Sequence, residues 1–338
     1  MKVAVVGCGL IGKKRVNALG ADHALVAAVD KDLARAQALA AMRPGAVATA
    51  NWREVVRHPD VEAVIVATTN DSLAPVTLEA IRAGKHVLVE KPAARSPDEL
   101  VPVLAASERA GVHVQVGFNH RFHPAFLKAR AIVDSEALGP LMFLRARYGH
   151  GGRVGYDREW RADPKVAGGG ELLDQGVHLI DLSRWFLGDF VRQEGWVHTW
   201  FWDMPVEDNG FLLLRTKEDR AAWLHASCTE WKNLFSFELY GRVGKLHVEG
   251  LGGSYGVERL TFYRMKPEMG PPDNETWEFP GEDTSWRAEF ESFARKIATG
   301  EGGVPTLGDA KAALEIVAKA YEQSGKSENR KIEKSEKR

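Results

Sequence analysis

The sequence predicts an α/β protein of two domains: a doubly wound parallel sheet, followed by a domain built on antiparallel strands. Three observations lead to this expectation. The first 120 residues alternate short apolar runs with helical patterns, residues 192–280 form successive strand patterns joined by turns, and nine of the ten tryptophans follow residue 150. A chain of 338 residues also suits two cores better than one.

The first region contains short runs that are apolar throughout, which is typical of strands buried on both faces of a parallel sheet. The expected strands are residues 2–6, 24–29, 63–67, 86–89 and 112–116. The helices expected between them are residues 10–19, 33–42, 75–83 and 96–110. This alternation of strand and helix predicts right-handed crossovers between parallel strands.

The second region changes pattern after residue 120. Helices are expected at 124–135, 171–187, 285–298 and 310–323, and strands at 141–148, 210–216, 221–227, 235–240, 245–249 and 258–263. We therefore expect domains at 1–120 and 121–325. The segment 326–338 has nine charged residues and a single aliphatic one, which predicts a disordered tail.

Composition excludes several classes of protein. The formal net charge is −1 and no domain-sized stretch is strongly basic, so neither nucleic acid nor an anionic membrane is an expected partner. No window of 18 apolar residues is present, and the apolar run 3–6 is too short for a signal peptide. Cys8 and Cys228 form no CxxC pair, which favours a reducing compartment, and we expect a cytoplasmic protein.

A glycine-rich turn follows the first strand and opens the first helix. Gly7, Gly9 and Gly12 form the pattern GxGxxG. The first glycine allows the tight turn, the second lets a pyrophosphate approach the backbone, and the third lets the helix pack closely on the strand. The helix N-terminus, at Leu10 and Ile11, offers N–H groups to the phosphates. This context predicts a dinucleotide site, and the alternative is a glycine-rich turn that binds nothing.

An acidic residue ends the second strand. Asp30 lies eighteen residues after Gly12, where a carboxylate accepts hydrogen bonds from both ribose hydroxyls and repels a 2′-phosphate. This residue favours NAD over NADP. Lys31 beside it leaves NADP possible, since a cation can help to hold a 2′-phosphate.

Two charged residues directly follow the buried strand 86–89. Ligands of open α/β sheets bind at the carboxyl ends of the strands, so Glu90 and Lys91 are candidate cofactor contacts. Pro92 restricts Lys91 to an extended conformation. A lysine there can donate to a substrate hydroxyl and stabilise a developing alkoxide. The alternative is a surface lysine beside a turn.

The expected helix 171–187 carries a carboxylate and an imidazole. Asp174 and His178 are four residues apart and share one face of the helix. Histidine is the natural general base near neutral pH, and a carboxylate can orient it. The alternative is an ordinary histidine capped by aspartate. No further ligands lie at suggestive spacing, so we expect no metal site.

Together these segments resemble the Gfo/Idh/MocA family (glucose–fructose oxidoreductase, inositol dehydrogenase, rhizopine catabolism). The matching segments are GCGLIG at 7–12, AGKHVLVEKP at 83–92, VGFNHRF at 116–122 and GGGELLDQGVHLIDLSRWFLGD at 168–189. The resemblance covers essentially the whole chain. It implies an N-terminal Rossmann domain and a C-terminal α+β domain with an open, mostly antiparallel sheet, whose free face often forms the interface of a homodimer or homotetramer.

The resemblance also implies roles for individual residues. Lys91 would position the reacting oxygen, Asp174 would assist at a neighbouring hydroxyl, and His178 would be the acid/base. Asn119 and Arg121 would lie near the nicotinamide or the substrate.

One segment departs from the family pattern. Where many members have Thr-Pro-Asn-x-x-His after the fourth strand, this chain has Thr69 for the proline and Leu73 for the histidine. Thr68 and Asn70 remain candidate cofactor contacts.

The substrate expected from the resemblance is a sugar, a nucleotide sugar or a cyclitol. In the loop 156–163, Trp160 can stack on a sugar face and Arg161 can bind a carboxylate or phosphate. A solvated structural loop is the alternative. The preferred function is NAD-dependent hydride transfer at a secondary alcohol or ketone of a sugar, nucleotide sugar or uronate. Three rivals stay open: an inositol dehydrogenase, an NAD-dependent glycosidase with a transient hydride step, and a non-catalytic NAD-binding regulator.

Overall fold

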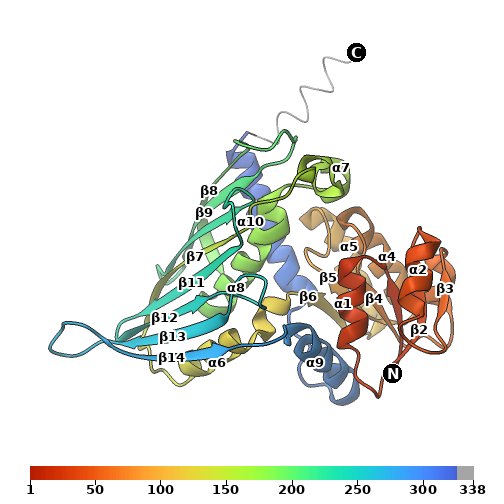
Figure 1. Cartoon of the computed structure of the whole chain (residues 1–338), viewed down its shortest axis with the longest axis horizontal. Helices are drawn as coiled ribbons and strands as arrows, with labels where there is room; N and C mark the ends of the chain where they lie inside the picture. The colour runs from red at the N-terminus through yellow and green to blue at the C-terminus, as the bar shows by residue number, and fades with distance from the viewer. Residues whose placement is uncertain (326–338) are drawn as a thin grey trace, which may run out of the picture. The chain divides into compact units, whose positions relative to one another are not determined.

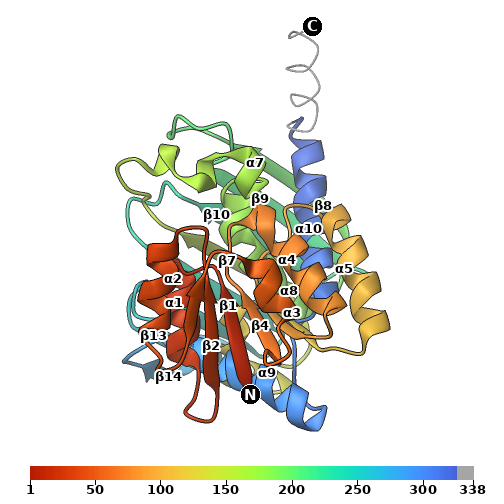
Figure 2. The same ribbon diagram turned by 90° about the vertical axis from the view of Figure 1, so that its right-hand side faces the viewer.

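The computed structural model describes residues 1–325, which divide into two compact units (Figures 1 and 2). Unit 1 comprises Met1–Asn119, Lys165–Gly168 and Trp286–Leu314, and unit 2 comprises the remaining described residues. The chain therefore passes between the units several times, whereas the sequence suggested a single boundary at residue 120. The functional division into cofactor and substrate domains stays a prediction. The expected tail 326–338 lies outside the described residues.

Unit 1 contains a six-stranded parallel sheet in the order β3-β2-β1-β4-β5-β6, which confirms the doubly wound arrangement. Figure 2 labels its strands β2, β1 and β4. The strands are β1 (Lys2–Val6), β2 (Ala24–Val29), β3 (Val47–Thr49), β4 (Ala63–Val66), β5 (His86–Glu90) and β6 (Val114–Gly117). The helices that follow them are α1 (Leu10–Ala18), α2 (Leu33–Ala40), α3 (Trp52–Arg57), α4 (Asn70–Arg82) and α5 (Pro97–Ala110).

The central strands of this sheet are buried on both faces, as their continuous apolar sequences predict. All four residues of β4 are buried, for example. On one face, α1 and α2 share a core with Phe290 and Phe293 of α9 (Ser285–Thr299). A late segment of the chain thus completes the hydrophobic core of the first sheet.

Three expectations for unit 1 need correction. β3 and α3 were not expected, because three and six residues are too few to show a hydrophobic period. Helix α4 begins at Asn70 rather than at residue 75, and Pro75 lies inside it. Burial of Leu73 and Ala74 favours helix before the proline despite the hydrogen bond that Pro75 cannot donate.

Unit 2 contains an eight-stranded sheet in the order β14-β13-β12-β11-β7-β10-β9-β8. All neighbouring strands are antiparallel except β7 and β10. The strands are β7 (Leu141–Gly149), β8 (Phe190–His198), β9 (Asn209–Thr216), β10 (Ala221–Ser227), β11 (Leu234–Gly241), β12 (Gly244–Glu249), β13 (Glu258–Arg264) and β14 (Asp273–Phe279). The open antiparallel sheet is confirmed. The edge strands β8 and β14 were missed, because most of their residues are at least partly exposed and give no apolar pattern.

Helices α6 (Pro124–Asp134) and α8 (Val177–Leu187) pack on one face of this sheet (Figure 1). Strand residues alternate accordingly: Leu212, Leu214 and Leu224 are buried, whereas Leu213 and Trp223 on the other face are exposed. The sheet therefore buries one face within its own unit and leaves an apolar second face open.

The segment expected to be one helix over 171–187 has two parts. A π-helical turn, Leu172–Gly176, precedes α8. Such turns occur frequently at functional sites. Asp174 thus lies on the wide turn and His178 on the first turn of α8.

The glycines before this turn are closely packed. A Cβ at Gly169 would lie 2.0 Å from the hydroxyl of Tyr321 in α10 (Leu307–Gln323), and one at Gly170 would lie 2.0 Å from the carbonyl oxygen of Glu207. Glu207 also accepts hydrogen bonds from the Gly170 N–H, at 3.0 Å, and from Tyr321, at 2.7 Å. Only glycine allows the chain to pass this close to its neighbours.

Across residues 1–325, we find no helix with both the length and the apolar character needed to span a membrane.

Candidate active site

The glycine-rich turn of unit 1 has a different steric environment at each glycine. A Cβ at Gly7, which has a φ of +99°, would lie 2.2 Å from the carbonyl oxygen of Ala67. A Cβ at Gly12 would lie 2.1 Å from the carbonyl oxygen of Gly7. At Gly9, by contrast, a Cβ would have no neighbour within 4 Å. Gly7 and Gly12 are therefore required by the fold, whereas Gly9 leaves open space beside the backbone.

The N-terminus of α1 is suited to binding an anion. Its N-cap residue, Gly9, provides no side-chain hydrogen bond, and its first turn, which includes Leu10 and Ile11, contains no acidic residue. The first N–H groups of a helix lack intrahelical acceptors and lie at the positive end of the helix dipole. Together with the open space at Gly9, this turn fits the pyrophosphate of a dinucleotide.

Asp30 is held beside this turn by two backbone hydrogen bonds. Its Oδ2 accepts from the Cys8 N–H at 2.8 Å, and its Oδ1 accepts from the Asp32 N–H at 2.9 Å. A carboxylate has about four acceptor positions, so two remain for the hydroxyls of a ribose. Lys31 is exposed. The structure thus brings together the predicted glycines and the predicted acid.

Thr68 and Asn70 lie where β4 leads into α4. Thr68 donates to the carbonyl oxygen of Thr69 at 3.1 Å. The buried Asn70 side chain donates to the carbonyl oxygen of Ala167 at 2.8 Å, and so holds the segment 165–168 in unit 1. The side-chain amide of Asn70 therefore has a structural role. A cofactor contact by Thr68 or Asn70 stays a prediction.

Glu90 and Lys91 follow one another at the end of β5, but their environments differ. Lys91 is partly buried. The Glu90 carboxylate is buried and accepts a hydrogen bond from Arg15 Nε at 2.6 Å. Sequence reasoning had assigned Glu90 as a cofactor contact and had not identified Arg15.

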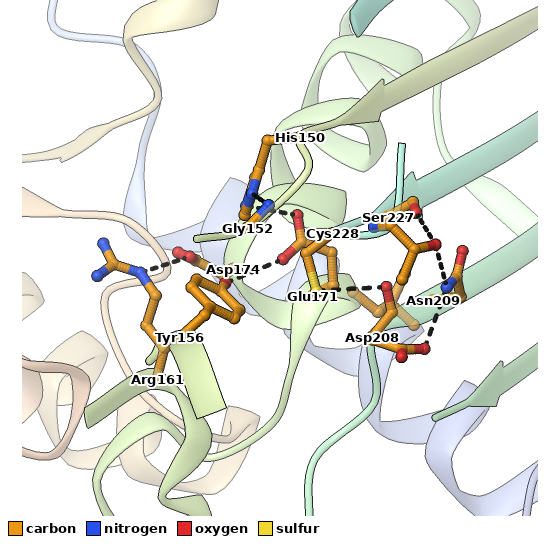
Figure 3. Close-up of polar contacts among 12 residues, drawn as sticks. His150, Gly152, Tyr156, Arg161, Glu171, Asp174, Asp208, Asn209, Ser227 and Cys228 are labelled. Atoms are coloured by element: carbon orange, nitrogen blue, oxygen red, sulfur yellow. Dashed lines mark hydrogen bonds and ion pairs between the residues drawn. The ribbon is translucent and has the colours of Figure 1, made fainter. Parts of the chain in front are cut away.

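In unit 2, Asp174 binds one of the residues expected to contact substrate (Figure 3). The Nε of Arg161 donates to Asp174 Oδ2 at 2.9 Å. Burial lowers the pKa of Arg161, but Asp174 and Glu159 raise it, and the net pKa lies above its usual value. The guanidinium also lies over the ring of Trp160, with its Cζ 4.6 Å from the centroid. One face of Trp160 is therefore covered by Arg161.

A buried carboxylate that sequence reasoning missed lies three residues before Asp174 (Figure 3). Glu171 is 2% exposed, and its carboxylate lies 3.5 Å from both His150 Nε2 and the Tyr156 hydroxyl. His150 Nδ1 accepts the Gly152 N–H at 2.9 Å, so the ring proton of a neutral His150 lies on Nε2, toward Glu171. Burial lowers the pKa of His150, but Glu171 raises it above its usual value. A charged residue between Gly170 and two leucines was the available signal.

His178 is buried in an aromatic environment. Its ring stacks on that of His120 with centroids 3.7 Å apart and planes 16° apart, and the Tyr148 ring lies 6.1 Å away. Both imidazoles are 4% exposed. Burial raises the pKa of Tyr148 well above its usual value, so its hydroxyl stays protonated. The stacking fixes the orientation of His178, and no sequence signal identified His120 as its partner.

Asn119 and Arg121 are both buried, in or beside the short helix Asn119–Phe122. Arg121 donates two hydrogen bonds to Asp181, at 2.8 and 2.6 Å. The Arg121 guanidinium is thus joined to α8, and its expected role near the nicotinamide or the substrate stays a prediction. A group of His, Cys, Asp or Glu side chains suited to a metal ion is not found within residues 1–325.

Comparison with known families gives two matches. Residues 1–118 match the model described as an oxidoreductase family with an NAD-binding Rossmann fold. Residues 126–247 match the model of the GFO/IDH/MocA C-terminal domain.

Two curated relatives are dehydrogenases. A levoglucosan dehydrogenase from Pseudarthrobacter phenanthrenivorans is 30% identical over 50% of this chain. An inositol 2-dehydrogenase from Saccharopolyspora erythraea is 32% identical over 64% of this chain. The alignments span only 44% and 63% of these two relatives.

Two solved structures resemble the whole described fold. A levoglucosan dehydrogenase in complex with NADH and levoglucosan has a TM-score of 0.84 and 22% identity, with 96% of this chain and 98% of that chain covered. The protein GenD2 from gentamicin A biosynthesis, in complex with NAD, has a TM-score of 0.82 and 26% identity, with 96% and 94% covered. The glycine turn with Asp30, the two sheets and the two family matches agree, and the chain belongs to the Gfo/Idh/MocA family of NAD-binding oxidoreductases.

Proposed function

We propose that this protein oxidises a secondary alcohol of a neutral sugar or cyclitol, or reduces the corresponding ketone, with NAD as the redox partner. The observation that carries the proposal is the environment of His178. This imidazole is buried, is held by stacking on His120, and follows a π-helical turn that carries Asp174. A fixed histidine next in sequence to a polar, carboxylate-bearing turn is suited to acid–base work on a hydroxyl.

The proposed roles divide the reaction into a hydride and a proton. NAD, held by the glycine turn and Asp30, would supply the hydride acceptor for the alcohol and, as NADH, the hydride donor for the ketone. His178 removes the hydroxyl proton, Lys91 donates a hydrogen bond to the oxygen, and Asp174 accepts from a neighbouring hydroxyl. The positive charge of the lysine ammonium stabilises the negative charge that develops on this oxygen. The curated dehydrogenases and reductases among the relatives support this reaction class.

The charges around Arg161 favour a neutral substrate over a uronate or a nucleotide sugar. Arg161 is bound to Asp174 at 2.9 Å and lies 3.8 Å from Glu159. Asp174 therefore already compensates its charge, whereas Glu159 is also bound by Arg153 at 2.7 Å. An anion that bound Arg161 would have to compete with Asp174 and would lie beside its carboxylate. Vicinal hydroxyls, which donate to carboxylates, fit this environment better.

The inositol dehydrogenase that the sequence left open falls within this proposal, because inositol is a cyclitol. The NAD-dependent glycosidase would release sugar without net formation of NADH, so absorbance at steady state separates it from the proposal. The regulator is disfavoured because the chain retains both Lys91 and His178.

We further propose that the protein is a homodimer or homotetramer through the open face of the second sheet. That face carries a set of exposed or half-exposed apolar side chains: Phe143, Trp196, Phe211, Leu213 and Trp223. Exposed apolar patches of this kind mark protein–protein contacts.

A cytoplasmic location also stays a prediction, supported by two buried cysteines that form no disulfide; cell fractionation tests it.

Catalytic variants test the central proposal. Lys91→Ala and His178→Ala are expected to lower kcat for a sugar or inositol by about 10²–10⁴-fold, because each removes a group that acts on the reacting oxygen or its proton. NADH absorbance measures the rate, and NAD titration by tryptophan fluorescence is expected to show unchanged binding. Near-normal kcat in both variants contradicts the site assignment, and sugar release without NADH supports the glycosidase.

The glycine turn gives a matched pair of variants. Gly9→Ala is expected to fold normally but to weaken NAD binding by about tenfold or more, because its Cβ enters the open space assigned to the pyrophosphate. Gly12→Ala is expected to destabilise the protein by about 1–3 kcal/mol, because its Cβ meets the backbone of Gly7. Thermal melts and NAD titrations measure the two effects. A stable Gly9→Ala variant with unchanged NAD affinity would argue against this phosphate site.

Substrate charge can be tested with sugar and uronate pairs. A neutral hexose or inositol is expected to exceed the matching uronate in kcat/KM by at least about tenfold. Arg161→Met is expected to lower kcat/KM for the neutral substrate, because Asp174 loses its partner. Arg192→Met, an exposed arginine of β8, serves as the control. A preference for the uronate that disappears in Arg161→Met would show that Arg161 binds an anion instead.

The oligomer is tested by light scattering. The wild-type protein is expected to have two or four times the mass of one chain. Trp223→Glu is expected to give a folded monomer, because it places a charge on the open apolar face. Leu127→Glu, at an exposed position of α6, is the control and is expected to leave the mass unchanged. A wild-type monomer would contradict the proposal.

A further inference from the structure

Arg15 lies at the centre of a buried ion triad in unit 1. Its Nε donates to Glu90 Oε1 at 2.6 Å, and its Nη1 donates to Glu289 Oε2 at 2.5 Å. The side chains of Arg15 and Glu289 are 0% exposed and that of Glu90 is 9% exposed. Burial lowers the pKa of Arg15, but Glu289 and Glu90 raise it, and the net pKa lies above its usual value. The guanidinium is therefore charged under all working conditions.

The triad joins three segments that are distant in sequence. Arg15 lies on α1, the helix that opens with the dinucleotide turn, Glu90 is the last residue of β5, and Glu289 lies on α9. The ring of Trp286, also on α9, lies 4.6 Å from the Arg15 Cζ. Space for the guanidinium exists only because residue 117 is glycine: a Cβ there would lie 2.6 Å from Arg15 Nη2 and 3.0 Å from Glu90 Oε2.

Glu90 is also the anchor for the backbone of Lys91. It pairs with Gly117 in the parallel ladder between β5 and β6, and its carbonyl oxygen accepts the Ala93 N–H at 2.9 Å. That bond closes a turn around Lys91 and Pro92. Ala93 is buried and has a φ of +70°, a conformation that L-residues adopt only when their surroundings enforce it. The triad holds the side chain of Glu90 on one side of this turn, and the ladder holds its backbone.

We propose that Glu90 is a positioning residue for Lys91, fixed by Arg15, and that its carboxylate does not contact the cofactor. This inference rests on the proposed catalytic role of Lys91. Without the ion pair to Arg15, the side chain of residue 90 is no longer held in place, and residue 90 is covalently joined to Lys91. Glu289 neutralises the same guanidinium from α9 but lies nearly 200 residues from Lys91 in sequence. Of the two carboxylates, only that of Glu90 belongs to the residue next to Lys91.

The matched variants Glu90→Gln and Glu289→Gln test this proposal. Both keep the size of the side chain and remove one carboxylate from Arg15, so both are expected to lower the thermal midpoint. Glu90→Gln is expected to lower kcat at least tenfold more than Glu289→Gln, with NAD affinity within twofold of wild type. Glu90→Asp, which keeps the charge, is expected to recover part of kcat. Thermal melts, NAD titration and kcat with a sugar or inositol at saturating NAD are the measurements.

Each alternative outcome overturns the inference in a recognisable way. If Glu90→Gln and Glu289→Gln have equal kcat, the triad is only structural. If Glu90→Gln weakens NAD binding while kcat holds, Glu90 is a cofactor contact as its sequence position suggested. Failure of the proposed function is separate, because Lys91→Ala would then keep its activity.

Discussion

The close approach of α1 to the first sheet is the constraint on which unit 1 depends. Gly12 brings the helix so near to the glycine turn that a single methyl group would lie 2.1 Å from the Gly7 carbonyl oxygen. Because Arg15 lies three residues later on the same side of α1, it is carried into the interior. A buried guanidinium needs anionic partners, and β5 and α9 supply them through Glu90 and Glu289. Gly12, which packs α1 against the glycine turn, thus also determines where charge is buried.

Unit 2 also contains glycines at positions where the backbone passes too close to its neighbours for a Cβ. Gly169 and Gly170 let the chain pass against Tyr321 and Glu207 at distances that no side chain permits. The π-helical turn that follows carries Asp174, and α8 carries His178. In both units, glycines without room for a Cβ fix the backbone just before the residues that are proposed to act. Close packing, rather than flexibility, explains these glycine-rich motifs.

The fold was largely predictable because its signals are local. The apolar runs gave β1, β2, β4 and β5 to within one residue, and the turns gave the antiparallel strands. Sequence reasoning failed where local pattern is weak or overridden: β3 is too short, β14 is mostly exposed, and α4 continues through Pro75 because tertiary burial outweighs the missing hydrogen bond.

The site was predictable in part for the same reason. Gly7, Gly9, Gly12 and Asp30 lie in one turn and at one strand end, so a motif of fixed spacing places them together. The partners of Arg15, Asp174 and His178 come from segments up to 274 residues away, and no spacing rule encodes such pairs. The sequence, for example, suggested that Arg161 could bind a carboxylate or phosphate of the substrate. In the structure, its guanidinium already forms an ion pair with Asp174.

This difference explains why the cofactor is better defined than the substrate. A dinucleotide presents the same phosphates and ribose to every Rossmann domain, so backbone N–H groups and one acid suffice to recognise it. A sugar or cyclitol is distinguished only by the positions of its hydroxyls, which side chains must match one by one. In unit 2 the side chains proposed to contact substrate are held as an ion pair, Arg161 with Asp174, and as stacked rings, His120 with His178. Under the proposed function, substrate preference would therefore depend on these pairs rather than on single contacts.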